Sequence, residues 1–178
     1  SRERWPAHTA SAARRRCVSV LVRRAPGLLE LPSSSKDFLY RGQEWLRRVP
    51  MSNITEAVLS SEAGSPELFQ LSEPCEAQQI DFFISHSWHD NVTEKYRKLR
   101  DFAVEFEHKH GREPTFWLDK CCLNHDQMAQ GLEVLPVFLM SCKSVVILGG
   151  ETYAKRLWCV WELYVYFAFR PNADITVL

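Results

Sequence analysis

Four short apolar runs divide the second half of the chain, and longer amphipathic segments separate them. The runs cover residues 80–85, 115–118, 145–148 and 174–178, and their length and β-branched or aromatic content are typical of buried strands. Segments of helical length lie between them, at 91–110, 132–142 and 157–169. This alternation predicts an α/β fold in which about four parallel strands carry helices on both faces.

The segment 157–169 is the most apolar of the predicted helices, and Glu162 is its only charged residue. Such a composition predicts a helix that is buried on nearly all sides. It is too short to span a bilayer, which needs roughly 20 apolar residues. A buried carboxyl group must be paired, protonated or used in function, because burying an unpaired charge is costly. Two interpretations therefore stay open: a structural ion pair with a base from another element, or a functional carboxylate.

The first half of the chain differs in pattern and in charge. Residues 1–34 are rich in Arg, Ala, Ser and Pro and predict a flexible arm, while residues 35–49 have the spacing of one amphipathic helix. A short helix near Ile54 to Leu59 precedes a polar linker. Residues 1–50 hold eleven Lys and Arg against four Asp and Glu, whereas residues 51–178 hold eleven against eighteen. We therefore predict a basic, partly helical extension over 1–78 and an α/β domain over 79–178.

Composition excludes several classes of protein. The basic clusters are short and lack interleaved aromatic residues, so no nucleic-acid surface is expected. No stretch is long and apolar enough for an integral membrane segment. The six cysteines lack the spacing of a disulfide framework, and several fall in apolar runs. Buried, reduced thiols of this kind indicate an intracellular, cytoplasmic protein.

Polar residues follow each predicted strand, and ligands of parallel sheets bind beyond these carboxyl ends. The strand ends are residues 87–90, 119–122 and 149–153, and Glu162 could face the same crevice. No phosphate-binding glycine motif and no nucleophile elbow is present. Three further hypotheses remain open here: a zinc site, a Cys–His nucleophile at Cys121, and paired carboxylates at Asp90 and Asp119. The zinc hypothesis uses His86, His89, Cys121, Cys122 and His125.

Three segments resemble one known family. DFFISHSWHD at 81–90 is similar to the first-strand box of TIR (Toll/interleukin-1 receptor) domains, and FWLDKCCLN at 116–124 resembles their second strand and following loop. SVVILGGETYAKRLWCVWEL at 144–163 contains the W-C-x-x-E-L signature of plant-type TIR domains. The resemblance implies a flavodoxin-like fold. Because TIR domains continue beyond a fourth strand, it also implies that this sequence stops short of a complete domain.

The resemblance implies an intracellular signalling domain and, as one activity, NAD⁺ nucleosidase chemistry. The glutamate of W-C-x-x-E-L is the catalytic residue of that activity and corresponds to Glu162. By position, Trp158 could line the pocket, and Ser87, Trp88 and Asp119 could contact the ribose and phosphates. NAD⁺ would be the substrate, and no cofactor or metal is expected. The alternative is a non-catalytic TIR-type module that self-associates or binds other TIR-like domains.

Overall fold

The four predicted strands form a parallel sheet. The computed structural model describes residues 33–61, 65–124, 126, 128–171 and 175–178, so the predicted arm at 1–34 lies almost wholly outside the described residues. The strands are β3 (Ile80–His86), β4 (Thr115–Trp117), β5 (Cys142–Leu148) and β6 (Ile175–Val177). They run parallel in the order β4-β3-β5-β6. The first of them thus lies between the second and the third, as in flavodoxin-like sheets, which confirms the predicted fold class.

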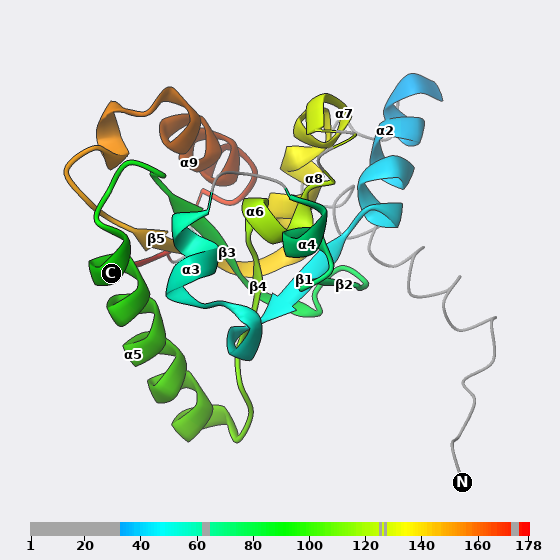
Figure 1. Ribbon diagram of the computed structural model, residues 1–178. Helices are drawn as coiled ribbons and strands as arrows, with labels where there is room; N and C mark the ends of the chain where they lie inside the picture. The colour runs from blue at the N-terminus through cyan, green and yellow to red at the C-terminus, as the bar shows by residue number, and fades with distance from the viewer. Residues whose placement is uncertain (1–32, 62–64, 125, 127, 172–174) are drawn as a thin grey trace, which may run out of the picture.

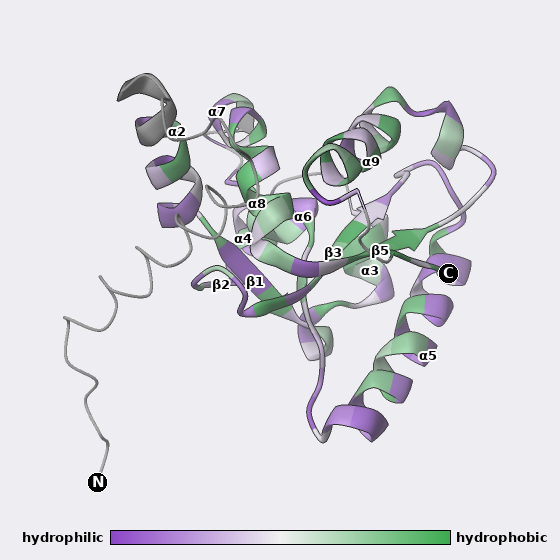
Figure 2. Cartoon of the chain, turned by 180° about the vertical axis from the view of Figure 1, so that it is seen from behind, coloured by the Kyte–Doolittle hydropathy of each residue, from purple (hydrophilic) through white to green (hydrophobic). Residues whose placement is uncertain are grey.

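Helices cover both faces of this sheet (Figure 1). On one face lies α5 (Val92–His110), and on the other lie α8 (Leu135–Ser141) and α9 (Leu157–Phe169). The Asn91 side chain caps α5 by accepting the Glu94 N–H at 2.9 Å, and Gly111 ends the helix with a left-handed φ of 69°. Figure 2 shows apolar and polar turns alternating along α5, as the sequence predicts for a helix with one buried face.

Two further strands come from the segment that the sequence analysis assigned to an extension. The strand β1 (Arg47–Pro50) pairs antiparallel with β4, and β2 (Glu73–Pro74) pairs antiparallel with β1. The predicted helix over 35–49 is therefore wrong beyond residue 44, because α2 (Ser33–Glu44) ends there and β1 follows. Val49 lies opposite Phe116 and is buried. Pairing with β4, rather than local periodicity, determines the conformation here.

The same segment also supplies short helices that belong to the domain. These are η2 (Met51–Asn53), α3 (Glu56–Ser60) and α4 (Pro66–Phe69). Leu46, Ile54 and Leu59 belong to the same hydrophobic core as the parallel strands. The predicted boundary at residue 79 therefore does not separate two cores, since the sheet and its core continue back to residue 46.

The remaining elements lie between β4 and α9. They are α6 (Asp119–Cys122), α7 (Met128–Glu133) and η4 (Tyr153–Lys155). The helix α7 begins before the segment 132–142 that the sequence predicted as helical. Pro136 lies in the first turn of α8, where its missing N–H costs no helical hydrogen bond.

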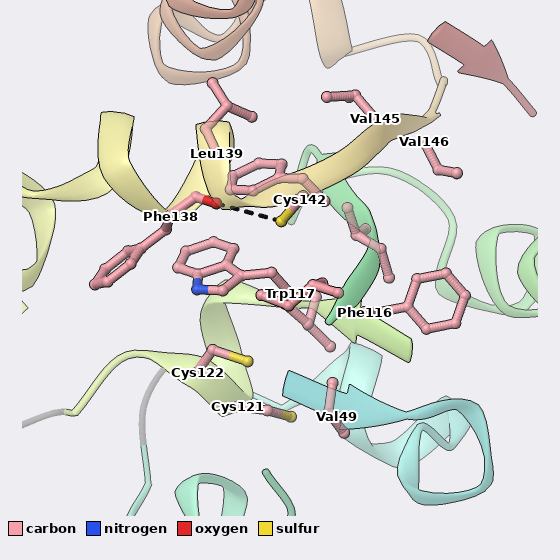
Figure 3. Close-up of a cluster of buried hydrophobic side chains, with 14 of the residues drawn as sticks. Val49, Phe116, Trp117, Cys121, Cys122, Phe138, Leu139, Cys142, Val145 and Val146 are labelled. Atoms are coloured by element: carbon pink, nitrogen blue, oxygen red, sulfur yellow. Dashed lines mark hydrogen bonds between the residues drawn. The ribbon is translucent and has the colours of Figure 1, made fainter. Parts of the chain in front are cut away.

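The core is packed with aromatic and sulfur-containing side chains (Figure 3). Trp117 stacks on Phe83 and on Phe138, with ring centroids 4.6 Å and 5.4 Å apart. Cys121, Cys122 and Cys142 lie in this cluster as free thiols, and the Cys142 thiol donates to the Phe138 carbonyl at 3.3 Å. The expectation that the cysteines are buried is thereby confirmed for these three.

One prediction about α9 is wrong, because the helix is not buried on all sides. Its inner face buries Cys159, Glu162, Val165 and Tyr166, but its outer face is open, with Leu157 84% and Tyr164 72% exposed. Trp158, Val160, Phe167 and Phe169 are also exposed. In Figure 2, α9 lacks the strongly polar stripe of α5. The helix α9 forms the outer layer on its face of the sheet. The apolar composition of its sequence did not reveal that one of its faces is exposed. Within the described residues, no helix combines the length and apolarity needed to cross a membrane.

Candidate functional site

The carboxyl end of β3 is the centre of the candidate site. The chain reverses its winding direction between β3 and β5, and ligands of doubly wound sheets bind at this switch point. Ser85 and His86 end β3, so their side chains point to opposite sides of the strand. Each side chain anchors a separate polar cluster, one around Glu162 and one around Asp119.

The Glu162 cluster lies between α9 and the end of β3. Glu162 is 4% exposed, and the Ser85 hydroxyl donates to its Oε2 at 2.5 Å. The Ser85 oxygen also lies 2.7 Å from the Tyr153 hydroxyl, which η4 supplies. Burial raises the pKa of Glu162 to about 8, aided by the charge of Asp119 and opposed by hydrogen bonds from Ser85 and Trp158. The carboxyl is therefore held mainly in its protonated form at neutral pH.

The sequence left open whether a base neutralises Glu162. Among the described residues, no Lys, Arg or His forms an ion pair with it, and its hydrogen-bond partners are uncharged. The carboxyl does reach the predicted edge of the sheet, but neighbouring side chains enclose it. Trp158 is one of these neighbours: it hydrogen-bonds the carboxyl and stacks on Trp161 at 5.2 Å.

The Asp119 cluster lies on the other side of the β3 end. Asp119 begins α6, and its two oxygens accept from different partners: His86 Nε2 lies 3.2 Å from Oδ1, and Trp88 Nε1 donates to Oδ2 at 2.9 Å. Burial alone would raise the pKa of Asp119, but the His86 charge and the hydrogen bonds from His86, Trp88 and the Lys120 N–H hold it below its ordinary value. Trp88 remains 45% exposed. The result is an anchored indole beside an ionised carboxylate.

The two clusters are joined at the first turn of α9. The Cys159 thiol donates to the His86 carbonyl at 3.4 Å, which fixes the helix to the strand end. The Asp119 charge also contributes to the raised pKa of Glu162. Four of the five predicted residues, Glu162, Trp158, Trp88 and Asp119, are thus brought to one strand end.

The fifth predicted residue, Ser87, belongs to a different contact. Its hydroxyl lies 2.6 Å from the Thr152 hydroxyl, and Asp90 Oδ1 accepts from the Thr152 N–H and hydroxyl, both at 2.8 Å. These bonds join the loops that follow β3 and β5. A Cβ on Gly150 would lie 2.3 Å from Asp90 Cγ, so only glycine permits this approach. A cavity of about 560 Å³ lies beside the joined loops, and His89, Asp90, Lys95, Lys98, Gly150 and Thr152 are among its lining residues.

The other hypotheses receive less support from the geometry. Burial raises the pKa of Cys121 to about 12, which is unsuited to a thiolate nucleophile. Among the described residues, no group of three His, Cys, Asp or Glu side chains is placed to hold a metal ion, and His125 lies outside them. Asp90 and Asp119 have separate partners, Thr152 for the first and His86 with Trp88 for the second.

Sequence reasoning missed Ser85, and it placed Lys120 and Tyr153 at the strand ends without giving either a role in the site. Ser85 could have been found, because it is the one hydroxyl in the apolar run 80–85. For Tyr153 and Lys120, the position at the strand ends was a signal, but their roles were not visible because their partners lie far away in the chain.

The fold and the site together define a flavodoxin-like α/β domain with a buried acid at the sheet's switch point. No known protein family, curated protein or solved structure matches the chain.

Proposed function

We propose that this chain is a TIR-like domain that cleaves the nicotinamide–ribose bond of NAD⁺, with Glu162 as the catalytic carboxylate. The observation that carries the proposal is a buried carboxyl group with uncharged partners at the carboxyl end of a central parallel strand. A purely structural carboxylate in such a position normally has a cationic partner. The W-C-x-x-E-L resemblance of residues 158–163 supports the same residue independently.

The chemistry follows from charge. Cleavage sends the electron pair of the C1′–N bond to the nicotinamide nitrogen, which leaves as a neutral base. The ribosyl carbon becomes positive, as in glycoside hydrolysis, and water captures it with loss of a proton. Ionised Glu162 stabilises this developing charge. The cationic nicotinamide ring itself favours ionisation of a carboxyl whose pKa is raised to about 8, so substrate binding prepares the catalyst.

The other side chains have separate roles. The exposed part of Trp88 offers a stacking surface for a planar ring, and Trp158, which hydrogen-bonds Glu162, lines the substrate site. Asp119 orients Trp88 through its indole N–H. Ser87 has an indirect role: its hydroxyl bonds to Thr152 and so positions the loop after β5, which lines the 560 Å³ cavity.

The direct test is nicotinamide release from NAD⁺ at high protein concentration. Glu162→Gln preserves the shape and the Ser85 hydrogen bond but cannot ionise, and we expect it to lose at least about 100-fold in kcat. Glu105→Gln, at an exposed position of α5, is the matched control and should keep full activity. The proposal is wrong if the unaltered chain releases nicotinamide no faster than the Glu162→Gln variant.

A second candidate function, self-association without turnover, is favoured by the open face of α9. Leu157, Val160 and Tyr164 form an exposed apolar strip at helical spacing. Contiguous apolar surface on a soluble domain commonly marks an interface. Sedimentation velocity over a concentration series tests this candidate. Tyr164→Glu should shift the chain toward monomer, whereas Val104→Glu, at an exposed apolar position of α5, should not. A chain that is monomeric throughout the series would exclude it.

A further inference from the structure

Lys120 is a buried lysine whose ammonium group lies against the end of another helix. It belongs to α6, is 2% exposed, and its Nζ donates to the carbonyls of Leu59 at 2.7 Å and Ser61 at 2.5 Å. These carbonyls lie at the end of α3, where helical carbonyls have no partner within their own helix. The contact joins residues about 60 positions apart in the chain.

The same ammonium group contacts the candidate site. Lys120 Nζ lies 5.3 Å from the centroid of the Trp88 ring, within the range of a cation–π interaction. The Lys120 backbone N–H donates to Asp119 Oδ1 at 2.7 Å, and Asp119 Oδ2 accepts from the Trp88 indole. Trp88 is therefore held by Asp119 at its N–H edge and by Lys120 at its face.

We propose that Lys120 is a positioning residue that holds Trp88 ready to stack on a planar ring of the dinucleotide, and that it does so from the end of α3. This inference rests on the proposed function for its substrate. Without Lys120, the half-exposed Trp88 would be held by a single hydrogen bond to Asp119, about which the ring of a loop side chain can still turn. Removing the ammonium group leaves the ring held by Asp119 at its N–H edge alone and leaves the Glu162 cluster intact.

The position of α3 matters because it determines where its last carbonyls lie. The Thr55 hydroxyl caps α3 by accepting the Val58 N–H at 3.2 Å, and Glu56 accepts a hydrogen bond from Thr93 of α5. Val58 and Leu59 are buried in the core. A change in α3 thus reaches Trp88 through Lys120, although Thr55 itself has no contact with the candidate site.

The test follows the Trp88 indole N–H in ¹H–¹⁵N spectra, with its resonance assigned as the one missing in Trp88→Phe. Lys120→Met should shift or broaden this resonance, raise KM for NAD⁺ at least about fivefold and leave kcat within about twofold. Arg170→Met is the matched control. Arg170 donates to the carbonyls of Met140, Cys142 and Lys143 and faces the Tyr166 ring, but it lies at the opposite end of β5. It should leave the Trp88 resonance unchanged.

A second variant guards against misfolding of Lys120→Met. Thr55→Val loosens α3 and keeps the ammonium group, and it should shift the Trp88 resonance in the unaltered chain but not further in the Lys120→Met background. An unchanged Trp88 resonance in Lys120→Met overturns the inference, as does a shifted resonance with unchanged KM. The spectra need no turnover, so a chain without NAD⁺ cleavage would refute the proposed function while the test of Trp88 positioning still gives a result.

Discussion

Replacing Glu162 by glutamine should stabilise the protein, and the gain should grow with pH. The carboxyl titrates near 4.5 in an unfolded chain, but burial raises its pKa to about 8 in the folded protein. Below pH 4.5 both states are protonated and the residue contributes nothing to pH dependence. Between the two values the unfolded chain ionises while the folded one does not, so stability falls as pH rises.

The magnitude follows from the two pKa values. Each pH unit between them is worth about 1.36 kcal/mol, so at pH 7 the penalty is 2.5 units multiplied by 1.36, or about 3.4 kcal/mol. This is a large part of the stability of a typical domain, about 5–15 kcal/mol. Glutamine cannot ionise, yet its amide oxygen can accept the Ser85 hydroxyl hydrogen. Glu162→Gln should therefore be more stable than the unaltered chain by about 3 kcal/mol at pH 7 and by almost nothing at pH 4.

Urea denaturation from pH 4 to pH 8.5 measures this difference, provided that the slope with denaturant is the same in both proteins. Glu105→Gln, on the exposed side of α5, is the control for removing one carboxylate at the surface. A difference between Glu162→Gln and the unaltered chain that stays constant with pH would refute the reasoning. So would a difference that shrinks as pH rises, because the first result would mean that folding leaves the pKa of the carboxyl unchanged and the second that folding lowers it.

Three further predictions concern activity, acid stability and loop geometry. If Glu162 must ionise to act, log kcat/KM for NAD⁺ should rise with unit slope from pH 6 and level off above about pH 8, and a flat profile would contradict this role. Asp81 is buried, and Arg112 binds its two oxygens at 2.7 Å each, which overcomes the effect of burial and lowers the pKa of Asp81. Its stabilisation is present above pH 4 and is lost as pH falls, so Asp81→Asn should cost about 3 kcal/mol at pH 7 but much less at pH 2, as followed by thermal unfolding. Gly150→Ala forces its methyl group into Asp90 and should lower Tm by several degrees, whereas Gly111→Ala, which meets no neighbour but strains a positive φ, should cost about 1 kcal/mol.

The parallel sheet could be predicted from the sequence because each of its strands is a compact apolar run. In β3, six of seven residues are buried, and the run IDFFIS shows this directly. The strand β1 could not be found in this way, because its sequence RRVP holds one apolar side chain and its pairing with β4 is a long-range contact. The pattern of apolar residues reveals a strand only where several of its side chains are buried, and in β1 Val49 is the one buried side chain.

The candidate site was predictable where a polar or charged residue occurs within or directly after an apolar segment. A single acid in an apolar helix drew attention to Glu162, and the polar residues after β3 and β4 drew attention to Trp88 and Asp119. The composition of α9 misled on its burial, because an apolar outer face and an apolar inner face look alike in sequence. The role of Lys120 was missed because its partners are backbone carbonyls, which every residue carries.

The antiparallel strands β1 and β2 cover the edge of the parallel sheet, which matters for the choice of shortened versions of this protein. A polypeptide starting at residue 79 would leave the backbone of β4 unpaired along one side, next to the large indole of Trp117. An exposed edge strand of this kind pairs with strands of other molecules and promotes aggregation. When β1 and β2 are present, the edge strand on this side is β2. Its Pro74 lacks a backbone N–H, and its Glu73 is charged and forms an ion pair with Arg48 at 2.8 Å, so both residues disfavour pairing with another molecule. Expression trials should therefore begin upstream of residue 46, and shorter versions should precipitate.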